Sequence, residues 1–116
     1  MSPPVLRLTL RVDTDEGRWL GPGKVRLLEL IAVHGSIAAA GREMGMSYRR
    51  AWLLVEAMSK SLGQPVVTAR PGGAGGGGAA LTTVGDALVE GYRQLERDAQ
   101  AATNVTLARL AALITQ

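Results

Sequence analysis

The apolar positions in residues 35–62 predict two helices joined by a tight turn. In the second helix, apolar residues recur at i, i+3, i+4, i+7 and i+11, which is the spacing of one buried helical face. Ser36 and Ser47 stand where the two helices begin, and a serine hydroxyl there accepts a hydrogen bond from an amide of the first turn. Gly45 supplies the left-handed residue that ends the first helix. The predicted buried face of the second helix consists of Ala51, Leu54, Val55, Met58 and Leu62. This order of elements is typical of a helix-turn-helix, here over residues 36–62.

Two shorter patterns precede this unit. Leucine and valine alternate with polar residues over residues 6–12, which predicts a half-buried strand, and residues 18–20 are expected to return as its partner after a turn. Trp19 is predicted to be a core or hairpin residue. Pro22 opens a further helix that runs to His34, with Gly35 as its stop.

A glycine-rich segment follows the helix-turn-helix. Residues 65–70 and 79–82 read as two short strands around glycines 72–78, and we interpret residues 65–82 as the wing of a winged helix. Without side chains, the backbone at such a tip can approach phosphates or enter the minor groove. A loop that makes no contacts is the alternative. A nucleotide-binding P-loop is excluded, because it needs Lys and Ser or Thr directly after the last glycine, where this chain has Ala79 and Ala80.

The last segment, residues 83–116, reads as a long helix capped by Thr82 or Thr83, with a kink or cap at Thr103-Asn104. It carries two apolar stripes, which is more than so small a head can bury. We therefore expect it to pair with a second copy in a two-fold dimer; the alternatives are that it folds back on its own domain or meets another domain. The residues predicted at the dimer interface are Leu88, Tyr92, Leu95, Ala99, Ala102, Leu107, Leu110 and Ile114. Val84 and Ala111 also belong to these stripes.

The predicted fold class is therefore mainly α with a small β component. Residues 1–82 form a winged helix-turn-helix, and residues 83–116 form a long C-terminal dimerisation helix. The 116 residues suffice for one domain, and the net charge is +3. Residues 1–82 contain ten Lys and Arg against six Asp and Glu. Such a balance suits a phosphate-facing head, although a solvated mixed surface explains it equally well.

Composition also argues against several function classes. The chain has no cysteine, which excludes disulfides and thiolate metal sites, and its single histidine, His34, has no second ligand nearby in the sequence. Its carboxylates lie on predicted helices without the paired acids of a hydrolytic site. We therefore expect no enzyme activity, no metal and no cofactor. No signal peptide or membrane-spanning run is apparent, so the expected location is cytoplasmic.

Two motifs resemble a known family. GMSYRRAW at residues 45–52 and GGAGGGGAALT at residues 72–82 look like the N-terminal domain of the molybdate-responsive (ModE-type) transcription regulators, relatives of the head domain of LysR-type regulators; the resemblance covers residues 6–97. It implies a winged helix-turn-helix dimer on palindromic operators linked to molybdate uptake or molybdoenzymes. Members often have a basic residue where this chain has Ala74, and we expect Arg70 to replace its phosphate contact. The family's molybdate-binding domains have no counterpart in these 116 residues, so no molybdate cofactor is expected.

The sequence thus predicts a DNA-binding transcription regulator whose partners are double-stranded DNA and a second copy of itself, with a separate sensor protein also conceivable. The alternative is a protein-interaction or small oxyanion-binding module with little DNA affinity. Arg49 and Arg50 are the best candidates for base or phosphate contacts, whereas Trp52 is predicted to pack. The full set of predicted DNA-binding residues is Ser36, Ser47, Tyr48, Arg49, Arg50, Arg70, Gly72, Gly73, Gly75 and Gly76.

Overall fold

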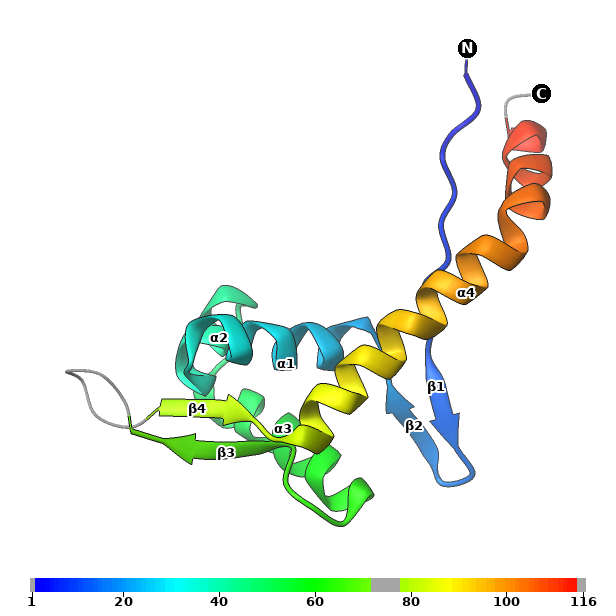
Figure 1. Ribbon diagram of the computed structural model, residues 1–116. Helices are drawn as coiled ribbons and strands as arrows, with labels where there is room; N and C mark the ends of the chain where they lie inside the picture. Colours follow the sequence, from blue (N-terminus) through cyan, green and yellow to red (C-terminus); the bar gives the residue numbers. More distant parts are fainter. Residues whose placement is uncertain (1, 72–77, 115–116) are drawn as a thin grey trace.

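The computed structural model describes residues 2–71 and 78–114. Within them the chain is mainly helical with two small antiparallel sheets, as the sequence predicts (Figure 1). The elements, in order, are β1 (Val12–Thr14), β2 (Gly17–Leu20), α1 (Pro22–His34), α2 (Ile37–Glu43), α3 (Tyr48–Leu62), β3 (Val67–Arg70), β4 (Gly78–Leu81) and α4 (Thr83–Ile114).

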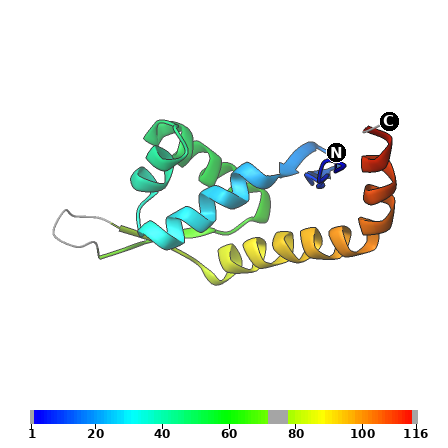
Figure 2. The same cartoon turned by 90° about the horizontal axis from the view of Figure 1, so that it is seen from above.

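Helix α1 is the centre of the core. Its residues Val25, Leu27, Leu28 and Ile31 have no solvent exposure, because α2, α3, β4 and the first part of α4 surround it (Figures 1 and 2). A helix buried on several sides is apolar on several sides, which is why its apolar pattern is broader than one stripe. Gly35 ends the helix in the left-handed conformation at φ +69°, and its N–H donates to the Ile31 carbonyl at 2.7 Å.

The helix-turn-helix forms where the caps predict it. The Ser36 hydroxyl accepts from the Ala39 amide, and the Ser47 hydroxyl accepts from the Arg50 amide, both at 3.1 Å. Gly45 adopts φ +71° in the turn. The predicted buried face of α3 is confirmed, with its five residues buried or half-buried. Helices α2 and α3 approach closely at Gly41, where an added Cβ would lie only 3.2 Å from that of Ala51.

The wing hairpin is fixed to the end of α1. Strands β3 and β4 pair antiparallel with Val67 opposite Leu81. The Ala79 amide donates to the Gly35 carbonyl at 2.8 Å, and the Thr82 amide donates to the Val66 carbonyl at 3.0 Å. The base of the wing therefore has a defined position beside the first turn of α2.

The N-terminal segment differs from the prediction. Its strand is only Val12–Thr14, although Leu6, Leu8 and Leu10 are half-buried and alternate with exposed neighbours as expected. The stretch before Val12 runs beside α4 rather than beside a strand (Figure 1). A ladder needs a partner strand, and β2 pairs with Val12, the last residue of the predicted strand, and with the two residues that follow it. Trp19, predicted in the hairpin or core, is half-buried and donates its indole N–H to Ser61 at 2.9 Å.

Helix α4 first covers the core and then leaves it. Thr82 caps it by accepting from the Gly85 amide at 3.1 Å. Its later part projects from the head and bends in the orange segment, within one continuous helix (Figure 2). The Thr103 hydroxyl donates to the Ala99 carbonyl at 2.7 Å, a back-bond that commonly bends helices.

Two residues of the predicted dimerisation stripes belong to the protomer's own core. Leu88 is 9% exposed and Tyr92 is 1% exposed, and the Tyr92 hydroxyl donates to the Leu10 carbonyl at 2.7 Å. This corrects the prediction that they face a second copy. It also extends the core of the head beyond residue 82, because the first turns of α4 lie against α1.

Candidate nucleic-acid interface

Helix α3 displays the predicted DNA-reading residues. Ser47, Tyr48, Arg49 and Arg50 are all exposed at or near its N-terminus. Because Ala51, Val55 and Met58 are buried, the 3.6-residue period turns Arg49 and Leu53 directly outward. Leu53 is 46% exposed, and the sequence analysis missed it, since a leucine between Trp52 and Leu54 in an apolar run is expected to be buried.

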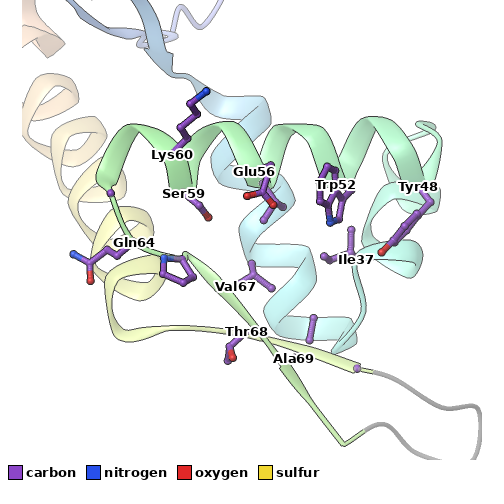
Figure 3. A pocket seen from close by; sticks show the side chains of 15 residues that line it. Ile37, Tyr48, Trp52, Glu56, Ser59, Lys60, Gln64, Val67, Thr68 and Ala69 are labelled. Carbon is purple, nitrogen blue, oxygen red and sulfur yellow. The ribbon is translucent and has the colours of Figure 1, made fainter.

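On one flank of α3, a groove of about 760 Å³ separates the helix from the wing. Tyr48 and Trp52 line it from α3, and Ile37 and Val67 line it from α2 and β3 (Figure 3). Trp52 is 42% exposed, so it packs less completely than predicted. Glu56 and Lys60 also line the groove, and their opposite charges offset one another.

The other flank of α3 faces a smaller, basic pocket of about 310 Å³, which we call the hairpin pocket. Its basic residues come from four parts of the chain, and none of the described residues that line it is acidic. These basic residues are Arg11, Arg18, Lys24 and Arg50. Apolar side chains of Trp19, Leu20, Met44, Met46 and Leu54 form the rest of its lining. A shallow hollow lined by Ser47, Arg49, Arg50, Leu53 and Leu54 adjoins it on α3.

The base of the wing brings Arg70 next to the start of α2. A Cβ added to Gly35 would lie 2.5 Å from the Arg70 guanidinium, so this side chain rests on the corner that precedes Ser36. Arg70 remains exposed. Gly72, Gly73, Gly75 and Gly76 lie outside the described residues.

The chain is similar in sequence to molybdenum-related proteins of several bacteria. The chain is 50% identical over 80 residues to the molybdenum-pterin-binding protein MopB of Rhodobacter capsulatus, covering 69% of this chain and 30% of that protein. It is 38% identical over 101 residues to the molybdenum transport protein ModE of Azotobacter vinelandii, covering 87% and 37%. It is 37% identical over 98 residues to the DNA-binding transcriptional dual regulator ModE of Escherichia coli, covering 84% and 37%.

The chain is a homologue of the ModE-type regulators. It spans about a third of the length of the relatives it matches. No protein-family model matches it. Among solved structures, the CbnR_DBD-DNA complex aligns with a TM-score of 0.55 at 22% identity, over 78% of this chain and 95% of that one. At this identity the likeness supports the fold, a winged helix-turn-helix.

The later part of α4 presents apolar side chains to solvent. Leu95, Leu110 and Ile114 of the predicted stripes are 48%, 47% and 60% exposed, and Ala102 is exposed as well. Ala99 and Leu107 are half-buried. Val105 and Leu113, which the sequence analysis did not select, are also exposed. The projecting half of the helix thus carries an apolar surface that the protomer does not cover.

The strongest ion pair in the described part of the chain is structural. Arg93 on α4 binds Glu29 on α1 through two hydrogen bonds of 2.5 and 3.0 Å, and it also binds Glu96 at 2.6 Å. The hydrogen bonds from Arg93 lower the pKa of the Glu29 carboxyl, whereas burial raises the pKa of the Tyr92 phenol. These contacts attach α4 to α1 in the core, and they involve no residue of α3.

The described residues offer no group of three or more His, Asp or Glu placed to hold a metal ion. His34 contacts Glu43 at 2.9 Å, across the ends of α1 and α2. No helix among the same residues is both long and apolar enough to span a membrane.

Proposed function

We propose that the chain is a sequence-specific DNA-binding head that regulates transcription as a homodimer on an inverted-repeat operator, in a pathway linked to molybdenum. The observation that carries the proposal is the N-terminal half of α3, where Tyr48, Arg49, Arg50 and Leu53 are exposed on a helix whose caps and buried face are fixed. An α-helix of this kind fits the major groove of B-DNA, and the wing beside it then faces the neighbouring minor groove.

Residues near the start of α3 suit distinct contacts. Arg49 points outward and can bind guanine O6 and N7 with two hydrogen bonds. Ser36 and Ser47, at the starts of α2 and α3, and Arg70, at the wing base, are placed for phosphates. The ModE of Escherichia coli is described as a DNA-binding transcriptional dual regulator, and this chain aligns with part of it.

The projecting part of α4 supports a two-fold dimer. Its apolar surface would be covered by the same surface of a second copy, as a two-fold interface requires. Two heads would then contact half-sites about one helical turn, ~34–36 Å, apart. The relatives' links to molybdenum support a role for the regulated genes in molybdenum metabolism.

The test is selection of bound sequences from a random DNA pool with the purified protein at moderate salt. We expect an enriched inverted repeat. Arg49→Ala should lower the affinity for this repeat by roughly 5- to 100-fold and remove the preference for one base at the position that Arg49 contacts. Arg7→Ala, which removes the same charge from the N-terminal segment, is the matched control and should bind normally. Sequence-indifferent binding would reject the proposal and favour a DNA-packing protein or a head that needs another chain. No binding at all would reject it in favour of a protein-interaction module.

A further inference from the structure

The two flanks of α3 differ in charge, and this difference is not what the sequence suggests. The groove on the wing side is lined by one acid and one base, Glu56 and Lys60. The hairpin pocket on the other side is lined by four basic residues and by no acidic residue among those described. Arg50 is shared between this pocket and the hollow on the outer face of α3. Positive charge is therefore continuous from the predicted reading surface to the β1–β2 hairpin.

Two of the four basic residues of the hairpin pocket, Lys24 and Arg11, are held by local contacts. The Lys24 ammonium donates to the Trp19 carbonyl at 2.9 Å, which leaves its other two protons for a ligand. Arg11 is paired with Asp13 at 2.8 and 3.0 Å, so much of its charge is already satisfied. Arg18 lies opposite Asp13 across the hairpin and is exposed. Lys24 and Arg50 thus carry charge that remains for an anion, and Arg18 adds to it although Asp13 also attracts its guanidinium.

Acidic residues at the turn of the hairpin would repel an anion, so only the base of the hairpin can approach one. Asp15 and Glu16 lie at the turn between β1 and β2 and do not line the pocket. The apolar side chains behind the basic residues exclude water locally and so strengthen any contact with a charged oxygen. The base of the hairpin, together with the start of α1, is the part that suits a phosphate.

DNA geometry identifies the occupant. A helix in the major groove has one phosphate strand on each side, because the groove is about 12 Å wide and bounded by both backbones. The wing flank of α3 faces one of these strands, so the hairpin pocket faces the other. We propose that the hairpin pocket binds a backbone phosphate of the strand on the side opposite the wing, with Arg18 and Lys24 as its ligands. This inference rests on the proposed DNA-binding function and adds a second phosphate contact to each head.

The test uses the full chain and the DNA sequence selected by the wild-type protein. For Arg18→Ala we expect roughly 10- to 150-fold weaker binding at low salt, from the loss of a charge-assisted hydrogen bond. The loss should be equal on all half-site variants, and the slope of log K against log salt should fall by about 0.9, one phosphate contact. Arg18→Lys should keep most of the slope. Arg7→Ala, with the same loss of charge, should leave both quantities unchanged.

A neutral methylphosphonate, placed at one backbone position at a time, locates the contact. At a single position beside the half-site it should weaken wild-type binding but leave Arg18→Ala unaffected. Equal effects in both proteins at every position would overturn the proposal. A second result would also overturn it: inorganic phosphate or molybdate stabilises the DNA-free wild type but not Arg18→Ala, while both proteins bind DNA equally well. The pocket would then hold a free oxyanion. Failure of the wild type to bind any DNA would instead reject the proposed function itself.

Discussion

At the scale of single residues, exposure on α3 separates the residues that can read a base from those that hold the helix. Local sequence was sufficient for Ser47 and Gly45, whose roles depend on neighbours three or four positions away. It was insufficient for Leu53 and Trp52. Both sit within an apolar run, and only the packing of α3 against α1 and α2 leaves them partly exposed. An exposed leucine one turn after Arg49 is placed to contact the C5 methyl group of thymine.

We therefore predict that Leu53→Ala weakens operator binding about fourfold, the value of one buried methyl or methylene group. Replacing the contacted thymine by deoxyuridine should have the same effect on the wild type and almost none on Leu53→Ala. The double-mutant cycle from equilibrium titrations measures this coupling. Val5→Ala, which shortens an apolar side chain that is 96% exposed in the N-terminal segment, is the control. Additive losses would show that Leu53 does not touch the thymine.

Gly85 is needed where α4 begins. A Cβ at this position would overlap the Val66 carbonyl oxygen, which belongs to the backbone and has little freedom to move. Gly85→Ala should therefore lower the free energy of unfolding by about 1–3 kcal/mol, as overpacking does. Gly91→Ala, in the same helix with open space around it, should be neutral or stabilising by roughly 0.5–1 kcal/mol. Urea denaturation of both variants measures this difference, and equal stabilities would contradict it.

At the scale of elements, the structure shows why the strand prediction near the N-terminus went too far and the helix predictions did not. A helix satisfies its own hydrogen bonds, so its caps and period predict it from local sequence. A strand depends on a partner, and the short β2 provides one only for Val12–Thr14. The alternating leucines of residues 6–10 instead lie beside α4. The alternating pattern therefore predicted the burial of these leucines correctly, but it predicted a strand as their neighbour where the structure has α4.

The ion pair that attaches α4 to α1 makes the free energy of unfolding depend on pH. Hydrogen bonds from Arg93 lower the pKa of Glu29 below its usual 4.5 in the folded protein. The unfolded chain therefore binds the proton more readily. The stabilisation by this pair is complete above about pH 4.5 and is lost as the pH falls through the lower, native pKa.

We expect Glu29→Gln to reduce stability at pH 7 and to flatten the fall in stability between about pH 5 and pH 3. Thermal melting followed by circular dichroism across this range measures it. Glu90→Gln, which changes an exposed carboxylate on α4, should keep the wild-type slope. A Glu29→Gln variant with an unchanged pH profile would show that the pair does not contribute.

At the scale of the whole molecule, the long α4 separates the head from a projecting apolar surface. The chain measures 56 Å along its longest axis, and the end of α4 lies far from the wing (Figure 1). If two copies join through this projecting part, the two α3 helices can face the same side of one duplex. Affinity for the operator then depends on self-association, because each head alone makes only half of the contacts.

Leu110→Glu should therefore weaken self-association roughly a hundredfold, about 2.7 kcal/mol, because a dimer interface would bury an unpaired carboxylate. Its secondary structure should persist, since Leu110 is 47% exposed in the protomer. Sedimentation equilibrium measures the association, and Ala108→Glu, a change at an exposed position on the opposite side of the same helix, is the control. A wild-type chain that is monomeric at high concentration would contradict the dimer.

The sequence by itself determined the elements that depend on near neighbours: the capped α2 and α3, the buried face of α3, the two wing strands and the helical character of the last segment. Only the tertiary structure decided which apolar stripe of α4 meets which surface, so that Leu88 and Tyr92 serve the core of the protomer. The tertiary structure also brings four basic residues from separate parts of the chain to one pocket: Arg11, Arg18, Lys24 and Arg50. The physical reason is that periodicity and capping act over one or two helical turns, whereas a shared surface depends on how separate elements pack together.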